Sequence, residues 1–137
     1  MAKYVVASIG DFSSDDRKIV TVKGREIGLY RIGDEYFAVY NWCPHEGAAL
    51  CKGPLVSRCR SDRPGRYTLE RKGEMLRCPW HGWEYDIRTG QSWCDPDSYK
   101  ARTFGVRVEP GEQLAKGPYV AETVPVEIDG EYLVLDL

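Results

Sequence analysis

Two short segments of this sequence each place a cysteine beside a histidine at chelating distance. Residues 43–47 read C-P-H-E-G, and residues 78–83 read C-P-W-H-G-W. His45 and His81 are the only histidines among the 137 residues, and both segments have a proline and a glycine at the same offsets from the cysteine. Packing alone does not explain a matched pair that uses every histidine, so the segments predict one metal site built from two loops.

The ligand types restrict the metal that such a site can hold. Two thiolates and two imidazoles suit zinc or an iron–sulfur centre rather than magnesium or calcium. Structural zinc sites commonly pair cysteine with cysteine and histidine with histidine, whereas each loop here supplies one of each. A [2Fe–2S] centre fits if Cys43 and Cys78 bind one iron while His45 and His81 bind the other. A structural zinc module with the same four ligands remains the alternative from another functional class.

The two segments resemble the ligand loops of the Rieske family, whose pattern is C-x-H followed by C-x-x-H. The likeness continues beyond the ligands, because residues 47–53 contain the family's G-x-x-L-x-x-G arrangement. Residues 81–90 are similar to its H-G-W-x-Y-D run followed by T-G. The resemblance extends over about residues 18–137 and is most specific over residues 41–90.

This resemblance implies one [2Fe–2S] cluster per chain, with Cys43, His45, Cys78 and His81 as its ligands. It also implies an all-β fold of stacked antiparallel sheets with a cluster-binding subdomain of two loops. The implied function is that of a one-electron carrier, a ferredoxin that passes electrons from a flavin-dependent reductase to a terminal oxygenase or a similar acceptor protein.

The chain is not expected to be an enzyme by itself. Rieske oxygenases hold a mononuclear iron in a separate catalytic domain, and no third histidine is present here to bind it. An alternative within the same chemistry is a small electron-transfer subunit of a larger oxidoreductase complex, like the Rieske-like subunit of assimilatory nitrite reductases. A redox or oxygen sensor that uses Cys59 as its reactive thiol is a third hypothesis.

The residues around the ligands place the expected potential low in the Rieske range. In the high-potential branch of the family a disulfide joins the two loops, and a serine follows the second H-G. Ala48 and Trp80 stand at the disulfide positions here, and Trp83 replaces the serine. Without that bridge and that hydroxyl, we expect a midpoint below about 0 mV, in a family range of about −150 to +300 mV.

Short runs of strand-forming residues between glycines and prolines predict an all-β chain, and we expect a single domain over residues 1–137. Turns are expected at residues 23–24, 33–35, 71–73, 88–90, 95–97 and 129–130. The expected strands cover residues 18–22, 26–32, 36–40, 66–70, 74–78, 83–86, 91–94, 101–109, 124–128 and 131–137.

The segment between the two loops is longer than in compact Rieske ferredoxins, which predicts an insertion at about residues 57–75. Seven basic and three acidic residues lie between Arg58 and Arg77, a local charge of +4, so the remainder carries −6. Basic residues near an exposed cluster could steer an acidic redox partner. The candidates are Arg58, Arg60, Arg63 and Arg66. A solvated loop with no docking role is the alternative.

Composition and hydropathy predict a cytoplasmic protein. No run of some eighteen apolar residues occurs, and a net charge of −2 gives no case for nucleic-acid or membrane binding. Cys51, Cys59 and Cys94 remain after the ligands are assigned, and three spare thiols fit a reducing compartment. We expect them to pack as small apolar groups, with a disulfide from Cys51 to Cys59 or Cys94 as the alternative.

All four tryptophans fall within or beside the motif region. They are Trp42, Trp80, Trp83 and Trp93. Indoles in this position are expected either to pack in the core or to form a dry shell over the cluster, with Trp80 near the tip.

Overall fold

The computed structural model describes residues 3–12, 16–45, 47–80, 82–92, 97, 99–114, 124 and 126–136. Within residues 57–63 and 66–73 only the backbone is described. The chain forms two compact units, of which unit 1 comprises Met1–Ala38 with Phe104–Leu137 and unit 2 comprises Val39–Thr103. The expectation of a single domain over residues 1–137 stays a prediction.

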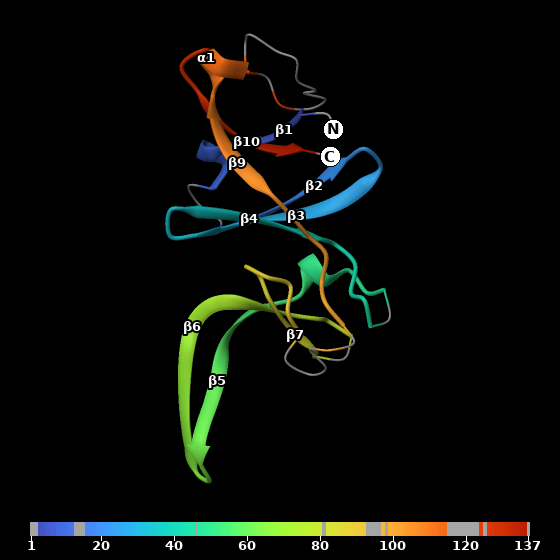
Figure 1. Cartoon of the computed structure of the whole chain (residues 1–137), viewed down its shortest axis with the longest axis vertical. Coiled ribbons are helices and arrows are strands. Elements are labelled where there is room, and N and C mark those ends of the chain that lie inside the picture. The colour runs from blue at the N-terminus through green and yellow to red at the C-terminus, as the bar shows by residue number, and fades with distance from the viewer. Residues whose placement is uncertain are drawn as a thin grey trace. The chain divides into compact units, whose positions relative to one another are not determined.

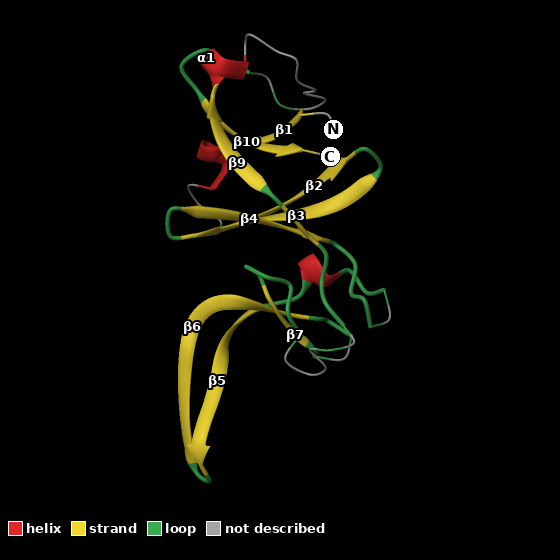
Figure 2. Ribbon diagram, in the orientation of Figure 1, coloured by secondary structure: helices red, strands yellow, loops and turns green. Residues whose placement is uncertain are grey.

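The described residues are mostly strands (Figures 1 and 2). The strands are β1 (Lys3–Ser8), β2 (Arg17–Val22), β3 (Arg25–Ile32), β4 (Glu35–Tyr40), β5 (Leu55–Arg63), β6 (Arg66–Arg77), β7 (Glu84–Asp86), β8 (Thr103–Phe104), β9 (Val106–Pro110) and β10 (Glu131–Asp136). The helical elements are short: η1 (Ile9–Phe12), η2 (Leu50–Lys52) and α1 (Gly111–Leu114). The all-β fold class is confirmed.

The strands form three sheets with the orders β1-β10-β9, β2-β3-β4-β8 and β5-β6-β7. The pairs β1–β10, β10–β9, β2–β3, β5–β6 and β6–β7 are all antiparallel. The third sheet belongs to unit 2, and its strands lead directly into the second ligand segment, since Cys78 follows β6 and β7 begins at Glu84.

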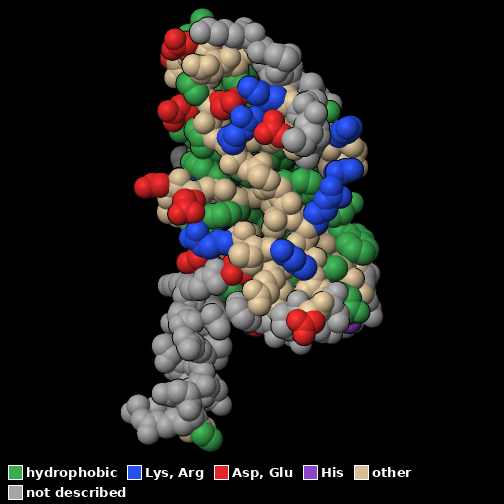
Figure 3. Space-filling model, viewed as in Figure 1, with side chains coloured by type: hydrophobic (Ala, Val, Ile, Leu, Met, Phe, Trp, Pro, Cys, Tyr) green, Lys and Arg blue, Asp and Glu red, His purple; other side chains and the backbone are tan. Residues whose placement is uncertain are grey.

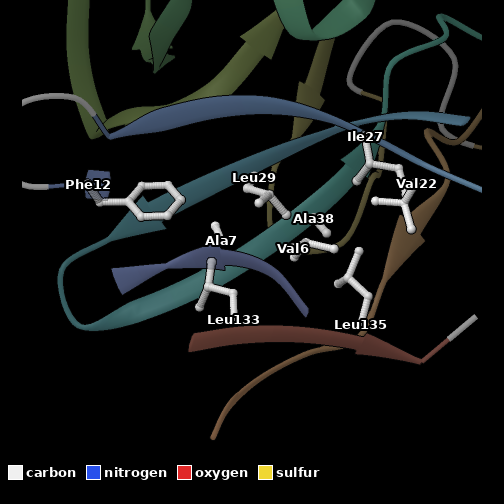
Figure 4. Close-up of a cluster of buried hydrophobic side chains, with 9 residues drawn as sticks. All are labelled: Val6, Ala7, Phe12, Val22, Ile27, Leu29, Ala38, Leu133 and Leu135. Carbon is white, nitrogen blue, oxygen red and sulfur yellow. The ribbon is translucent and has the colours of Figure 1, made fainter. Parts of the chain in front are cut away.

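The core of unit 1 lies between two of these sheets. Figure 4 shows side chains from β1 and β10 facing those from β3, with Phe12 at one end of the cluster. All nine residues of the cluster are buried: Val6, Ala7, Phe12, Val22, Ile27, Leu29, Ala38, Leu133 and Leu135. Burial of each valine, leucine, isoleucine or phenylalanine of this cluster contributes about 1.5–3 kcal/mol of transfer free energy, so this core fixes the β3–β4 hairpin. The hairpin in turn delivers the chain to Cys43.

Two predicted hairpins of unit 1 are confirmed. Lys23 and Gly24 join β2 to β3 with φ values of 53° and 77°. Positive φ at both central residues is the requirement of the type I′ turn, whose twist matches the flanking strands. Gly33, with a φ of 61°, lies in the turn between β3 and β4.

The predicted turn at residues 71–73 is wrong. β6 runs without a break from Arg66 to Arg77, and the chain reverses at Pro64 and Gly65, where Gly65 has a φ of 81°. A proline followed by a glycine at positive φ is a strong turn pair, and it outweighs the R-K-G signal. The extra residues of β6 are absorbed by a register shift opposite Val56 and Arg58.

The predicted strand over residues 124–128 is also wrong. Val124 and residues 126–128 are not in a strand, although β10 follows them. Both edges of β10 are occupied, by β1 on one side and β9 on the other, so no edge is left for a hairpin partner. β1 was not anticipated, and the expected strand over residues 101–109 is divided at Gly105 into β8 and β9.

The turn predicted at residues 88–90 is confirmed and closes beside the second ligand segment. Gly90 has a φ of 78°, its amide donates to the Asp86 carbonyl at 2.7 Å, and the Asp86 amide donates to the Gln91 carbonyl at 2.9 Å. The strand expected beyond it is reduced to a bridge between Tyr85 and Ser92. Residues 93–94, and residues 95–96 of the turn expected at 95–97, lie outside the described residues.

Gly90 and Gly24 provide a matched pair for testing how tightly this turn is packed. Their φ values are 78° and 77°, but a Cβ at Gly90 would lie 2.1 Å from the Ala101 carbonyl oxygen, whereas a Cβ at Gly24 would meet nothing within 4 Å. We expect Gly24→Ala to cost about 1–2 kcal/mol from φ strain alone. Gly90→Ala should cost at least about 1 kcal/mol more. Equal losses of unfolding free energy in the two variants, measured by thermal denaturation, would contradict the close approach of Gly90 to the Ala101 carbonyl.

Candidate metal centre

The first ligand loop is closed by two backbone hydrogen bonds around Cys43. The Cys43 amide donates to the Ala48 carbonyl at 2.8 Å, and the Gly47 amide donates to the Cys43 carbonyl at 2.6 Å. Gly47 has a φ of 80°, and a Cβ there would lie 2.9 Å from Nε1 of Trp42. Both the backbone conformation and the neighbouring indole therefore require glycine at this position.

The second ligand loop repeats this arrangement. The Cys78 amide donates to the Trp83 carbonyl at 2.7 Å, and the Gly82 amide donates to the Cys78 carbonyl at 3.0 Å. Gly82 has a φ of 73°. In both loops the cysteine amide thus reaches the fifth residue on, and its carbonyl accepts from the glycine four residues on. The repeated sequence offsets correspond to one repeated backbone conformation.

The predicted cysteine ligands are buried in these loops. Cys43 is 0% exposed and Cys78 is 2% exposed, and neither forms a disulfide. His45 is described, whereas His81 lies outside the described residues. Among the described side chains no three Cys, His, Asp or Glu residues form a metal-binding group by themselves. The assignment of His81, and with it the full ligand set, stays a prediction.

An aromatic stack joins the two loops. The imidazole of His45, from the first loop, lies on the indole of Trp83, from the second, with ring centroids 4.1 Å apart and planes at 12°. Tyr99 packs edge-on against both rings, at 5.7 Å from His45 and 5.1 Å from Trp83. These contacts restrict the orientation of the imidazole, which is the property a metal ligand requires.

Tyr85 adds a polar contact that the sequence analysis did not assign. Its buried hydroxyl lies 3.3 Å from Sγ of Cys43, although Tyr85 is in β7, after the second loop. If Cys43 is a thiolate ligand, the hydroxyl is the only possible donor of this pair. The signal was present in the H-G-W-x-Y-D run, where the tyrosine was quoted as part of the motif without a role.

The segment after the first loop is tied back to β4 through Cys51. The Cys51 amide donates to Oδ1 of the buried Asn41 at 2.7 Å, and its thiol lies 3.4 Å from the Val39 carbonyl. The prediction that Cys51 is a buried thiol outside any disulfide is confirmed. The side chain of Cys59 and all of Cys94 lie outside the described part of the chain.

The described tryptophans differ in exposure. Trp83 is half-buried in the stack with His45, but Trp42 is 48% exposed and Trp80 is 62% exposed. Core packing is therefore wrong for Trp42 and Trp80, and a dry shell over the cluster with Trp80 near the tip stays a prediction. Trp93 lies outside the described residues.

The donor set fits an iron–sulfur cluster. Two buried thiols, an imidazole fixed by stacking and a hydroxyl directed at one of the sulfurs form a soft, weakly hydrated environment. Cys43, His45 and Cys78 would supply ligands from the two matching loops. When bound, such a cluster accepts and releases one electron.

Comparison with known proteins agrees with this donor chemistry. The sequence model of the Rieske [2Fe-2S] domain matches residues 2–105, and the chain belongs to this family. Its cofactor is one [2Fe–2S] cluster.

A ferredoxin component of a dioxygenase system is among the similar proteins. The chain is 29% identical, over 108 residues, to the ferredoxin component of the naphthalene 1,2-dioxygenase system of Pseudomonas putida, covering 78% of this chain and 88% of that protein.

Two solved structures share the fold. The ferredoxin of carbazole 1,9a-dioxygenase from Nocardioides aromaticivorans IC177 has a TM-score of 0.59 and 19% identity, covering 97% of both chains. A nitrite reductase (NADPH) small-subunit protein has a TM-score of 0.55 and 16% identity, covering 97% of this chain and 98% of the other.

Among the residues that the structure describes, no helix combines the length and the apolar character needed to cross a bilayer.

Removing the Tyr85 hydroxyl should lower the midpoint potential. A hydrogen bond to a ligand sulfur stabilises the more negative, reduced state, so Tyr85→Phe favours the oxidised state. If the bond stabilises the reduced state by about 1 kcal/mol more than the oxidised one, the midpoint falls by about 40 mV. Redox titration monitored by visible absorption measures this shift.

Tyr99→Phe is the matched control, because it removes a hydroxyl from a ring that contacts His45 edge-on and leaves the ring itself in place. We expect a smaller shift for this variant. Equal shifts in the two variants, or a rise for Tyr85→Phe, would contradict a directed bond to Cys43.

Proposed function

We propose that the protein is a Rieske-type ferredoxin, a one-electron carrier that takes electrons from a flavin-dependent reductase and passes them to a terminal oxygenase or a similar acceptor protein. The observation that carries this proposal is the pair of identically hydrogen-bonded loops, each built around a buried cysteine. Similar proteins are named as ferredoxin components of dioxygenase systems, which supports the role of a carrier rather than of an enzyme.

The proposed ligands are Cys43 and Cys78 on one iron, with His45 and His81 on the other. This assignment explains why each loop contains one residue of each kind. With two thiolates the oxidised centre is formally neutral and becomes singly negative on reduction, whereas a centre with four thiolates goes from doubly to triply negative. Accepting an electron is therefore easier here than in a plant-type ferredoxin.

A second candidate is a small electron-transfer subunit within a larger oxidoreductase. The observation that favours it is the fold likeness to the nitrite reductase small-subunit protein at a TM-score of 0.55. Copurification distinguishes the two functions, because a permanent subunit elutes with its complex and a diffusing carrier elutes alone.

The proposed compartment is the cytoplasm. The support comes from Cys51, which the structure places outside any disulfide, in a buried position with its thiol directed at the Val39 carbonyl. A chain with several cysteines, one of which is a buried free thiol, suits a reducing environment.

The direct test of the cofactor and its ligation is spectroscopic. We expect a red-brown protein that contains iron and sulfide, with an anisotropic EPR signal after dithionite reduction. Its average g should lie below that of all-cysteine [2Fe–2S] proteins, because two ligands are imidazoles. We also expect a midpoint below about 0 mV, since the loops lack the disulfide and the serine of the high-potential branch. A colourless protein that contains zinc would refute the iron–sulfur cofactor. A clearly positive midpoint would refute the low potential.

The hairpin of β5 and β6 is proposed as the basic insertion that guides partner binding. Figure 1 shows the two strands running side by side past the short β7, and the segment from Arg58 to Arg77 carries the local charge of +4. Cys78 directly follows β6, so the basic hairpin leads straight into the second ligand loop. Long-range attraction to an acidic partner would then raise the rate of encounter.

Reversing two of these charges should slow electron transfer at low salt. We expect Arg63→Glu combined with Arg66→Glu to lower the second-order rate with a protein partner about tenfold or more at low ionic strength, with the difference shrinking as salt is added. Stopped-flow absorption at several salt concentrations measures this effect. The control reverses Lys23 and Arg107, two exposed residues of unit 1, with the same change in net charge. Equal rates for the two double variants would remove the hairpin from docking.

A further inference from the structure

Two exposed tryptophans lie beside the predicted cysteine ligands. Trp42 directly precedes Cys43 and is 48% exposed, and Trp80 stands two residues after Cys78 and is 62% exposed. They are the large hydrophobic side chains that unit 2 exposes among its described residues. Figure 3 shows hydrophobic side chains reaching the surface in the loop region of this unit. Each ligand loop thus presents one indole to solvent.

These two indoles remain exposed although the cysteines beside them are buried. Cys43 and Cys78 are already buried, and the ring contacts to His45 come from Trp83 and Tyr99. An exposed indole adjoining a functional site is more characteristic of a surface that another protein covers.

Trp42 is held in a fixed position despite its exposure. Its Nε1 atom lies so close to Gly47 that a Cβ there would approach it to 2.9 Å, and Gly47 is itself bonded to the Cys43 carbonyl at 2.6 Å. The indole is thus supported on one side by the turn of the first loop, with about half of its surface left open. A pre-positioned aromatic side chain loses little conformational entropy when a partner covers it.

The exposed area of these two side chains is large relative to the area of an electron-transfer interface. Together the two indoles expose about as much surface as one fully exposed tryptophan, roughly 250 Å². Transient redox complexes bury less than about 1,200 Å² in total, or about 600 Å² on each partner. The two residues could therefore supply more than a third of the contact area, in the residue type most enriched among interface hot spots.

The charges of the same unit indicate the chemistry of the partner. The exposed charged side chains that are described in unit 2 are four basic residues and one acidic residue, namely Lys52, Arg77, Lys100, Arg102 and Asp97. A unit with two exposed apolar anchors and mainly basic exposed charges fits an apolar depression bordered by acidic groups.

We propose that Trp42 and Trp80 anchor the docking of the protein that accepts the electron, a terminal oxygenase presenting an apolar depression with acidic groups around it. This inference rests on the proposed function and specifies the surface that performs it. In the complex, the reduced carrier loses one electron and the acceptor gains it, with no bond made or broken. Docking through both loops covers the ligand residues on either side and excludes water between the two redox centres.

The test measures electron transfer from the dithionite-reduced, desalted protein to purified terminal oxygenases by stopped-flow absorption, beginning with that of carbazole 1,9a-dioxygenase. Each rate is divided by the rate with ferricyanide, a small acceptor that needs no protein docking. We expect this ratio to fall at least tenfold for Trp80→Ala and for Trp42→Ala, with partial recovery in Trp80→Phe. Ile128→Ala, at a residue 70% exposed in unit 1, is the matched control and should leave the ratio unchanged.

The outcomes separate the surface from the function. A wild-type protein that reduces ferricyanide but none of the oxygenases would overturn a terminal oxygenase as the acceptor, and the docking surface with it. A wild-type protein that reduces an oxygenase, with equal ratios in both tryptophan variants, would overturn the surface alone. Sedimentation velocity measures whether the chain forms a dimer. A wild-type dimer that the Trp80→Ala substitution dissociates, with an unchanged oxygenase ratio, would overturn oxygenase docking and assign the indoles to contact with a second copy of this chain.

Discussion

Both ligand loops depend on the same two backbone hydrogen bonds, which close each loop around its cysteine. In each case the cysteine amide and carbonyl are used within the loop, so the thiol is directed inward while its own backbone stays satisfied. Gly47 and Gly82 make this closure possible, because both have φ values in the left-handed region. The sheets serve to deliver the chain to these two points, through β4 for the first loop and β6 for the second.

The loops are not independent of each other. His45 of the first loop stacks on Trp83 of the second, and the hydroxyl of Tyr85, which follows the second loop, contacts the Cys43 sulfur. Ligand orientation and sulfur hydrogen bonding in one loop are therefore determined by residues of the other. This arrangement makes the centre a property of the pair, and it explains how two short motifs far apart in the sequence can form one rigid site.

The parts of this molecule that follow from local chemistry could be predicted from sequence. Metal-ligand spacing identified the loops, and the glycine turns at Gly24 and Gly33 identified two hairpins. The turn after the first strand of the insertion was missed, because Pro64 and Gly65 competed with a second turn signal nearby. The edges available to β10 and the exposure of Trp42 and Trp80 depend on contacts between distant segments. Tyr85 was missed for the same reason, since its partner sulfur lies 42 residues away in the sequence.

The contacts that join the loops also bear on how a cluster is gained and lost. Opening of the first loop would remove His45 from Trp83 and Cys43 from the Tyr85 hydroxyl of β7, and opening of the second loop would break the His45–Trp83 stack from the other side. Neither loop can therefore open alone without loosening its partner. Cluster insertion and release should accordingly be cooperative, with both loops engaged or both disengaged, and a half-ligated form should be short-lived during maturation.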